Sequence, residues 1–317
     1  MPKVLITGAL GFVANHLIPL LIPEYQIIGL VLQTPQTKPH PITYLECDIT
    51  DSQAINSIIT AHKPEFIIHL AAVSQSWNTD VTKLFQTNLT GTLNIYQSIL
   101  NQKSYSPKII YVSSSDVYGQ TNNPSSIDES SSLNPINTYA VSKLSADRLS
   151  YQFSYSHNLN VTILRPFPHA GPGQSTGFFV PDMASQIVTI EQTPATTNQI
   201  SVGNLTSIRD YTDVRDMVRA YYLALTSNLP QGEVYNISSD HGIAIQDIFT
   251  QLTHLSTVDL SIHQDPNKLR PIDIPIAIGN SAKFRQATNW QPHIPLVQTL
   301  TDTLNYYRNL QSAQTTS

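Results

Sequence analysis

The stretch TYAVSK places Tyr139 four residues before Lys143. Residues four apart lie on one face of a helix, so the lysine ammonium can stand beside the phenol. A free tyrosine has a pKa of about 10 and exchanges protons poorly at neutral pH, whereas a nearby ammonium stabilises the phenolate. The pair could protonate a substrate oxygen, although the spacing also fits an ordinary helix face in a chain with 15 tyrosines.

Ser114 could take part in the same proton transfer if KIIYVS (108–113) forms a strand. The following residues, SSSDVYG (113–119), then put Ser114 at the carboxyl end of that strand. Ligands bind at this end of open α/β sheets. A serine hydroxyl there can orient a substrate carbonyl and share its hydrogen bond with Tyr139.

A glycine-containing turn, TGALGFV (7–13), follows the predicted first strand and opens a helix. Gly8 permits the tight turn, Gly11 lets the backbone approach a pyrophosphate, and Ala14 stands at the third position of the pattern. The helix N-terminus would hold the pyrophosphate. Its place directly after the first strand favours a dinucleotide site over a simple strand-to-helix turn.

The end of the second predicted strand does not decide between NAD and NADP. LVLQT (30–34) contains neither a carboxylate for a ribose 2′-hydroxyl nor an arginine for a 2′-phosphate, and Lys38 is only a distant candidate. After the third strand, Asp48 could accept a hydrogen bond from the adenine amino group. The alternative is that Asp51 or Thr50 simply caps the next helix.

Short apolar runs alternate with helical patterns in the first half of the chain. Near-continuous apolar strands between helices predict an α/β fold with a doubly wound parallel Rossmann sheet. His69 ends one of these strands and is expected to be structural. The polar segment 120–137 is expected to be a loop. The predicted strands are 3–7, 26–32, 43–47, 66–71, 108–113 and 161–165, and the helices lie near 11–22, 51–62, 80–102 and 138–156.

The pattern changes after residue 165, where PFPHAGPGQSTG (166–177) is rich in proline and glycine. We expect a dinucleotide-binding domain at 1–166 and a smaller mixed α/β substrate-binding lobe at 167–317. A helix near 213–225 is expected to pack back on the first domain.

Composition limits the classes of function. The net charge of −5 without a basic run argues against nucleic-acid binding. No segment supplies the roughly 20 apolar residues that span a bilayer, and the N-terminus lacks the pattern of a signal peptide. The single cysteine, Cys47, excludes an internal disulfide and fits a reducing compartment. We expect a cytoplasmic protein without a metal ion.

The motifs TGALGFV, CDITD (47–51), HLAA (69–72), the serine before VYG and YAVSK make nearly the whole chain resemble the extended short-chain dehydrogenase/reductases. The resemblance implies a catalytic triad of Ser114, Tyr139 and Lys143, with Lys143 also holding the nicotinamide ribose. It implies NADP or NAD as cofactor, with NADP preferred. The implied cofactor contacts are Gly8, Gly11, Phe12, Val13, Asp48, Ile49, Leu70, Ala71, Ala72, Tyr139 and Lys143.

The second half is similar to the GDP-4-dehydro-6-deoxymannose reductases, close relatives of the GDP-mannose 4,6-dehydratases. The similar segments are 171–187, 202–221, 232–239 and 265–275. Isolated arginines suit bidentate contact with a diphosphate, and Asp273 could accept from a ribose hydroxyl, although surface ion pairing is the alternative. Pro168 replaces a family asparagine that contacts substrate. The expected substrate contacts are Ser74, Ser114, Val180, Arg209, Arg270 and Asp273.

Several functions fit this scaffold. A reductase would deliver hydride to the 4-ketone of GDP-4-keto-6-deoxymannose, with Tyr139 as the proton donor, to give GDP-D-rhamnose or its 4-epimer. A 4,6-dehydratase needs a further acid–base group; related dehydratases use a glutamate where this chain has Asp116. A 4-epimerase is a third reaction. The intact Tyr139 and Lys143 argue against a non-catalytic nucleotide-binding protein. We favour the reductase, as a homodimer joined through the helices at 80–102 and 138–156, as in the family.

Overall fold

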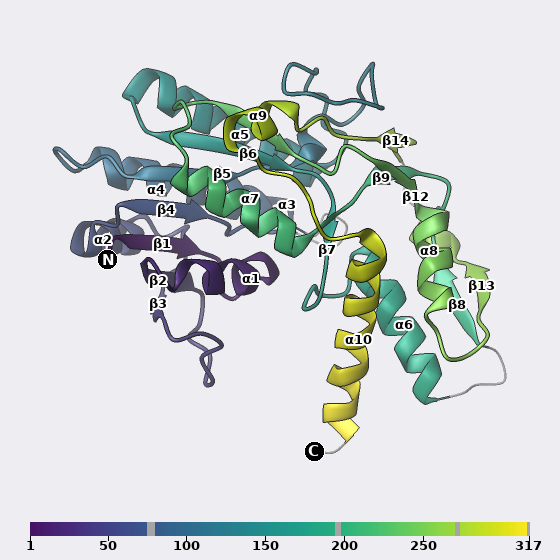
Figure 1. The fold of residues 1–317 in the computed structure, drawn as a ribbon. Coiled ribbons are helices and arrows are strands. Elements are labelled where there is room, and N and C mark those ends of the chain that lie inside the picture. Colours follow the sequence, from purple (N-terminus) through teal and green to yellow (C-terminus); the bar gives the residue numbers. More distant parts are fainter. Residues whose placement is uncertain (75–79, 194–197, 270–272, 316–317) are drawn as a thin grey trace.

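A parallel sheet organises the first part of the chain (Figure 1). The computed structural model describes residues 1–74, 80–193, 198–269 and 273–315. In these ranges every neighbouring pair of strands in the main sheet is parallel, which confirms the predicted doubly wound sheet. The strand order is β11 (Val234–Ile237), β6 (Val161–Pro166), β5 (Lys108–Val112), β4 (Phe66–His69), β1 (Lys3–Thr7), β2 (Gln26–Val31) and β3 (Thr43–Glu46). We did not expect β11, because its four residues, VYNI, are too few to show a clear period.

Alternate residues of a strand face opposite layers of helices. Val4 and Ile6 of β1 lie in the core on one face of the sheet, whereas Leu5 lies in the core on the other. The first face is covered by α1 (Phe12–Leu21), α7 (Val214–Thr226) and α9 (Ala282–Thr288). The second is covered by α2 (Ser52–His62), α4 (Gly91–Leu100) and α5 (Thr138–His157).

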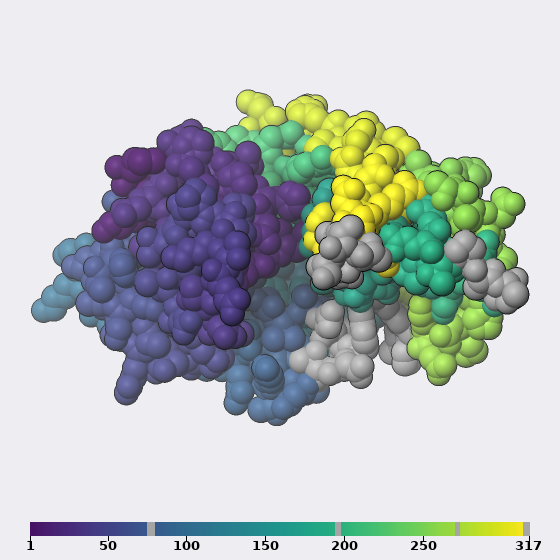
Figure 2. All heavy atoms as spheres, turned by 90° about the horizontal axis from the view of Figure 1, so that it is seen from below, coloured from purple at the N-terminus to yellow at the C-terminus, as the bar shows by residue number. Residues whose placement is uncertain are grey.

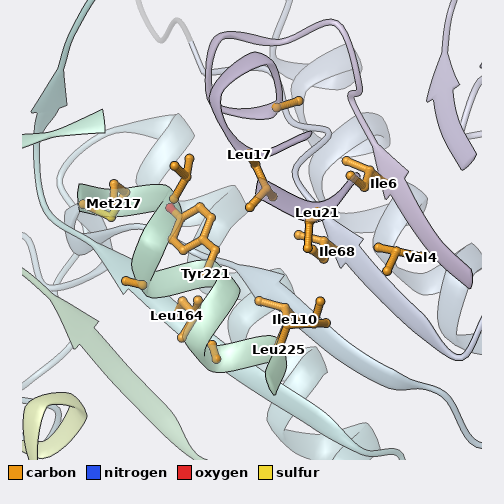
Figure 3. Close-up of a cluster of buried hydrophobic side chains, with 14 of the residues drawn as sticks. Val4, Ile6, Leu17, Leu21, Ile68, Ile110, Leu164, Met217, Tyr221 and Leu225 are labelled. Carbon is orange, nitrogen blue, oxygen red and sulfur yellow. The ribbon is translucent and has the colours of Figure 1, made fainter. Parts of the chain in front are cut away.

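Helix α7 returns to the sheet from beyond residue 166. Figure 3 shows Met217 and Tyr221 of α7 in the same cluster as Leu17 and Leu21 of α1, and all four side chains are buried. The chain therefore begins the lobe, comes back to complete the sheet with α7 and β11, and returns to it once more with α9 before α10.

The helix expected at 80–102 is interrupted. A π-helical turn, Gln86–Thr90, joins α3 (Val81–Phe85) to α4. Asn88 lies in this turn, and its carbonyl accepts a hydrogen bond from the Thr92 hydroxyl at 2.7 Å. Single π turns are rare and occur frequently at functional sites. An apolar pattern cannot show one inserted residue, so the sequence predicted a continuous helix.

The smaller lobe has a hydrophobic core of its own, and Figure 2 shows it (teal to yellow) beside the first part of the chain (purple and blue). Among the described residues, no helix combines the length and apolar character needed to cross a bilayer. The helices of the lobe are α6 (Phe179–Gln192), α8 (Ile245–His254) and α10 (Leu296–Thr315). Its strands are β7 (His169–Ala170), β8 (Gln199–Val202), β9 (Ile208–Asp210), β10 (Thr212–Asp213), β12 (Gly242–Ala244), β13 (Ser261–Gln264) and β14 (Ile276–Ala277).

Candidate active site

The turn between β1 and α1 has the shape that a pyrophosphate requires. Gly8 has φ +68°, a left-handed conformation that glycine adopts without strain, and a Cβ there would lie 3.0 Å from Cα of Ala71. Gly11 is the N-cap of α1, and no side chain among the described residues caps this helix. The first N–H groups of α1 thus suit an anion, so the dinucleotide expected from the sequence fits the turn.

Replacing Gly8 by alanine is expected to weaken NADH binding at least about tenfold, because the new methyl group would meet backbone atoms of Ala71. A fluorescence titration with NADH measures the effect. Gly173→Ala is the matched control, since Gly173 also has positive φ (+87°) but its Cβ would meet nothing within 4 Å. Equal binding losses in the two variants would show that close approach at Gly8 is unimportant.

A buried hydrogen-bond chain supports the turn from below. Thr7 Oγ1 accepts from the N–H groups of Leu70 at 3.1 Å and Ala71 at 3.0 Å, so its proton points to His69 Nδ1 at 2.7 Å. His69 Nε2 lies 3.0 Å from the Thr92 hydroxyl, whose own proton goes to the π turn. Nε2 must therefore carry the imidazole proton. Burial, the main cause, lowers the pKa of His69 to about 3, so this histidine is neutral and structural.

Asn88 connects the segment after β4 to the first turn of α5. Its Oδ1 accepts from the Val73 N–H at 2.8 Å, and its Nδ2 donates to the Ser142 hydroxyl at 2.9 Å. Ser142 in turn donates to the Tyr139 carbonyl at 2.8 Å. Sequence reasoning missed this residue, although an asparagine inside an apolar helical pattern is an available signal. Ser74, the next residue after Val73, is exposed.

The segment expected to meet the adenine is fixed by polar contacts. Asp48 Oδ1 accepts from both the N–H and the hydroxyl of Thr50, at 2.9 and 2.8 Å. Asp51 is the N-cap of α2, so the capping alternative holds for this residue and not for Asp48. Ile49 is buried, and its carbonyl accepts from Asn94 Nδ2 at 2.9 Å. Asn94, which the sequence analysis missed, thus holds the segment against α4.

The structure brings Ser114, Tyr139 and Lys143 together at the carboxyl end of β5. Ser114 precedes a short 3-10 helix, Ser115–Val117, and its Oγ accepts from the Asp116 N–H at 3.1 Å. The Ser114 side chain is also near enough to the Tyr139 phenol to lower its pKa. Because the serine oxygen accepts from Asp116, its proton is available to a neighbouring oxygen.

The surroundings keep Tyr139 protonated. Burial raises its pKa well above the usual value, the Asp116 carboxylate raises it further, and the Ser114 hydrogen bond opposes both. We expected a depressed pKa because of Lys143, but burial dominates. Tyr139 therefore keeps its proton at neutral pH.

Lys143 is buried, with 4% of its surface exposed. Its Nζ donates to the Val112 carbonyl at 2.7 Å and lies 4.7 Å from the centre of the Tyr111 ring. Burial lowers the pKa of Lys143 to about 7, against the charge of Asp147, which raises it. A small change in its surroundings can therefore change its charge at physiological pH.

A buried ion pair holds α5 against β6 one helical turn beyond Lys143. Both oxygens of Asp147 accept from Arg165, each at 2.9 Å. Arg165 also donates to the Tyr118 hydroxyl at 3.0 Å, and Tyr118 belongs to the segment that follows Ser114. Arg165 therefore contacts the two elements that carry the triad, and the sequence analysis missed it.

The residues expected at the substrate do not all reach a common site. Arg209 forms an ion pair with Asp273 at 2.8 Å, and Asn204 Nδ2 donates to the same carboxylate at 2.8 Å, so the ion-pairing alternative is realised. Val180 is 1% exposed and packs in the core of the lobe, so its side chain offers little surface to a substrate. Arg270 lies outside the described residues.

The segment containing Pro168 lies beside the nucleotide turn. The Phe12 ring stacks on His169, with ring centres 6.2 Å apart and planes at 7°. The Pro168 carbonyl accepts from the Thr212 N–H at 3.0 Å. The proline thus leaves this backbone contact in place while removing the side-chain donor that an asparagine would supply. Val13, at the start of α1, is half-buried and packs against the core.

Comparisons with known proteins agree with this geometry. A family model described as GDP-mannose 4,6 dehydratase matches residues 5–303. A GDP-6-deoxy-D-mannose reductase of Pseudomonas aeruginosa is 33% identical over 94% of both chains. A GDP-6-deoxy-D-talose 4-dehydrogenase of Aggregatibacter actinomycetemcomitans is 30% identical over 89% of this chain and 90% of that protein.

Two solved structures share the fold of this chain. RMD of Pseudomonas aeruginosa, complexed with NADPH, superposes with a TM-score of 0.84 at 30% identity, covering 98% of this chain and all of that one. A UDP-glucose 4-epimerase of Thermotoga maritima with UDP-glucose gives a TM-score of 0.86 at 25% identity, covering 98% and 99%. These relatives act on nucleotide sugars through different reactions, so the scaffold alone does not choose the reaction.

Proposed function

The chain belongs to the extended short-chain dehydrogenase/reductases, as an NAD(P)-dependent enzyme of nucleotide-sugar chemistry, and from this premise we propose that it reduces the 4-ketone of GDP-4-dehydro-6-deoxy-D-mannose. The proposed product is GDP-D-rhamnose. Two relatives support a GDP-linked 6-deoxy sugar, since both are named for oxidation or reduction of such a sugar.

The observation that carries this proposal is the pairing of the Ser114 hydroxyl with a buried, protonated Tyr139 phenol at the end of β5. Two hydroxyl donors at one point suit a ketone oxygen that becomes an alkoxide. Reduction consumes a proton, and a tyrosine with a raised pKa has one to give.

In the proposed reaction each residue has one task. Ser114 donates to the ketone oxygen and orients it. Tyr139 gives its proton to the same oxygen as negative charge develops there. Lys143 stabilises the resulting phenolate with its ammonium group. When bound, the reduced nicotinamide supplies the hydride. Gly8 and Gly11 leave room for the pyrophosphate at the start of α1.

A dehydratase is the second candidate, because the matching family model carries that description. Asp116 stands where related dehydratases use a glutamate. Its nearby negative charge raises the pKa of Tyr139. This disfavours the opening oxidation, since that step needs a deprotonated tyrosine to accept the proton of the substrate hydroxyl.

The test mixes the purified protein with GDP-4-keto-6-deoxymannose and reduced nicotinamide, and follows loss of the nicotinamide absorbance. The proposal expects rapid loss and a GDP-6-deoxyhexose product. Conversion of GDP-mannose to the keto sugar without added reductant would instead support the dehydratase. An Asp116→Asn variant then separates the two, since it should abolish dehydration but only modestly change reduction.

The rate of ketone reduction is expected to fall as pH rises through about 7. The pKa of Lys143 is about 7, so its stabilising charge is present below this pH and is lost above it. Asp147→Asn removes a charge that raises this pKa, so the fall should move to lower pH. Single-turnover rates between about pH 5.5 and 9 measure both profiles. A wild-type rate that increases with pH would contradict the role of Lys143.

We also propose a homodimer through α4 and α5. Support comes from exposed apolar residues on these helices, among them Leu100, Val141, Tyr151 and Tyr155. Light scattering should give the mass of a dimer, and Tyr151→Glu should shift the protein towards the monomer.

A further inference from the structure

The adenosine ribose of a dinucleotide lies at the carboxyl end of β2 in folds of this kind. A carboxylate there binds the ribose 2′-hydroxyl of NAD, and an arginine there accepts the 2′-phosphate of NADP. In this chain β2 ends at Val31, and the next residues are Leu32, Gln33 and Thr34. Neither group is present in the strand where it is usually found.

The carboxylate comes instead from the neighbouring strand. Glu46 is the last residue of β3 and pairs in register with Val31. Its Oε1 accepts from the Thr34 N–H at 2.9 Å, so the side chain reaches across the end of β2. Figure 1 shows β3 beside β2 at the edge of the sheet. The Thr34 contact fixes one oxygen, while Oε2 makes no hydrogen bond within the described residues.

The charge around this point is also negative. Glu46 and Asp48 are both exposed at the ends of neighbouring segments. Lys38 is the only lysine or arginine between residues 32 and 50. Lys38 is exposed and forms no ion pair with the described residues. A 2′-phosphate, which carries about −1.5 to −2 charges at neutral pH, would therefore approach a fixed carboxylate with little compensation.

We propose that Glu46 determines the cofactor specificity and that the protein prefers NAD(H) to NADP(H). Its free carboxylate oxygen accepts a hydrogen bond from the ribose 2′-hydroxyl and repels a phosphate at the same position. This reverses the preference for NADP that the family resemblance implied. The end of the second strand by itself did not decide between the two cofactors. It rests on the proposed function only in requiring a dinucleotide, not in requiring a particular sugar.

Equilibrium binding tests the inference without any sugar substrate. The fluorescence of NADH and NADPH is titrated against wild-type protein, Glu46→Gln and the control Glu24→Gln. Glu24 is an exposed glutamate just before β2, at the opposite end of that strand. We expect the wild type to bind NADH at least about tenfold more tightly than NADPH. Glu46→Gln should reduce that ratio to about threefold or less, and Glu24→Gln should leave it unchanged.

Two results would overturn the inference. One is that the wild type binds NADPH as tightly as NADH or more tightly. If Lys38→Gln then loses affinity for NADPH, Lys38 holds the 2′-phosphate. The other is an unchanged ratio in Glu46→Gln. Failure of the wild type to bind either dinucleotide would contradict the proposed function itself. Normal dinucleotide binding without sugar reduction would contradict the proposed reaction, but it would leave the assignment of Glu46 intact.

Discussion

Replacement of Tyr139 by phenylalanine is expected to lower the rate of ketone reduction by about 10²- to 10⁴-fold, the range typical of a lost general acid. The ring still packs in its place, but no proton reaches the ketone oxygen. Binding of the nicotinamide cofactor should change little, because the hydroxyl of Tyr139 is one of many expected cofactor contacts and the others are kept. The decline in nicotinamide absorbance measures the rate, and fluorescence titration measures the binding.

Tyr306→Phe is the matched control for this result. Tyr306 lies on α10 of the lobe and is 37% exposed, so the same loss of a hydroxyl should leave the rate unchanged. A Tyr139→Phe variant that binds cofactor and retains more than about a tenth of the wild-type rate would mean that another group supplies the proton.

Replacement of Arg165 by methionine is expected to lower the free energy of unfolding by about 3–5 kcal/mol. Arg165 and Asp147 are 1% and 0% exposed, and the variant leaves the aspartate buried without its main partner. The double variant Arg165→Met, Asp147→Leu should recover most of the loss, because an apolar pair of similar size can replace a buried ion pair. Urea unfolding followed by circular dichroism measures each value.

Arg148→Met is the control for Arg165. Arg148 also pairs with Asp147, at 2.6 Å, but its side chain is 46% exposed. An exposed ion pair contributes about 0–1 kcal/mol, so this variant should be nearly as stable as the wild type. Similar destabilisation by the two arginine variants would show that burial of the pair does not decide its contribution.

The sheet and the residues of the triad could be predicted because each depends on local sequence. Buried parallel strands are near-continuous apolar runs, and Ser114 follows such a run directly. The glycine positions of the nucleotide turn are likewise set by one strand and one helix. Tyr139 and Lys143 share a helix, so a spacing of four is enough to place them on one face.

The features that could not be predicted depend on contacts between segments that are far apart in the sequence. Arg165 and Asp147 meet only after β6 and α5 have packed, and neither residue type indicates its partner. Glu46 acts at the end of β2 because β3 is its neighbour in register, a pairing that no spacing in the chain reveals. Val180 was placed at the substrate by family resemblance, yet the fold of the lobe buries its side chain. The raised pKa of Tyr139 follows from burial, which spacing does not predict.

The fate of a labelled hydride distinguishes a reductase from an enzyme that returns its own hydride. The protein is supplied with GDP-4-keto-6-deoxymannose and a reduced nicotinamide carrying deuterium at the transferable position, and the sugar product is examined by NMR. We expect one deuterium on carbon 4 of a GDP-6-deoxyhexose, formed in equal amount to the oxidised cofactor, and loss of this product in Tyr139→Phe. Turnover of GDP-mannose with no deuterium entering the sugar would contradict it, because an enzyme that returns its own hydride is not a reductase.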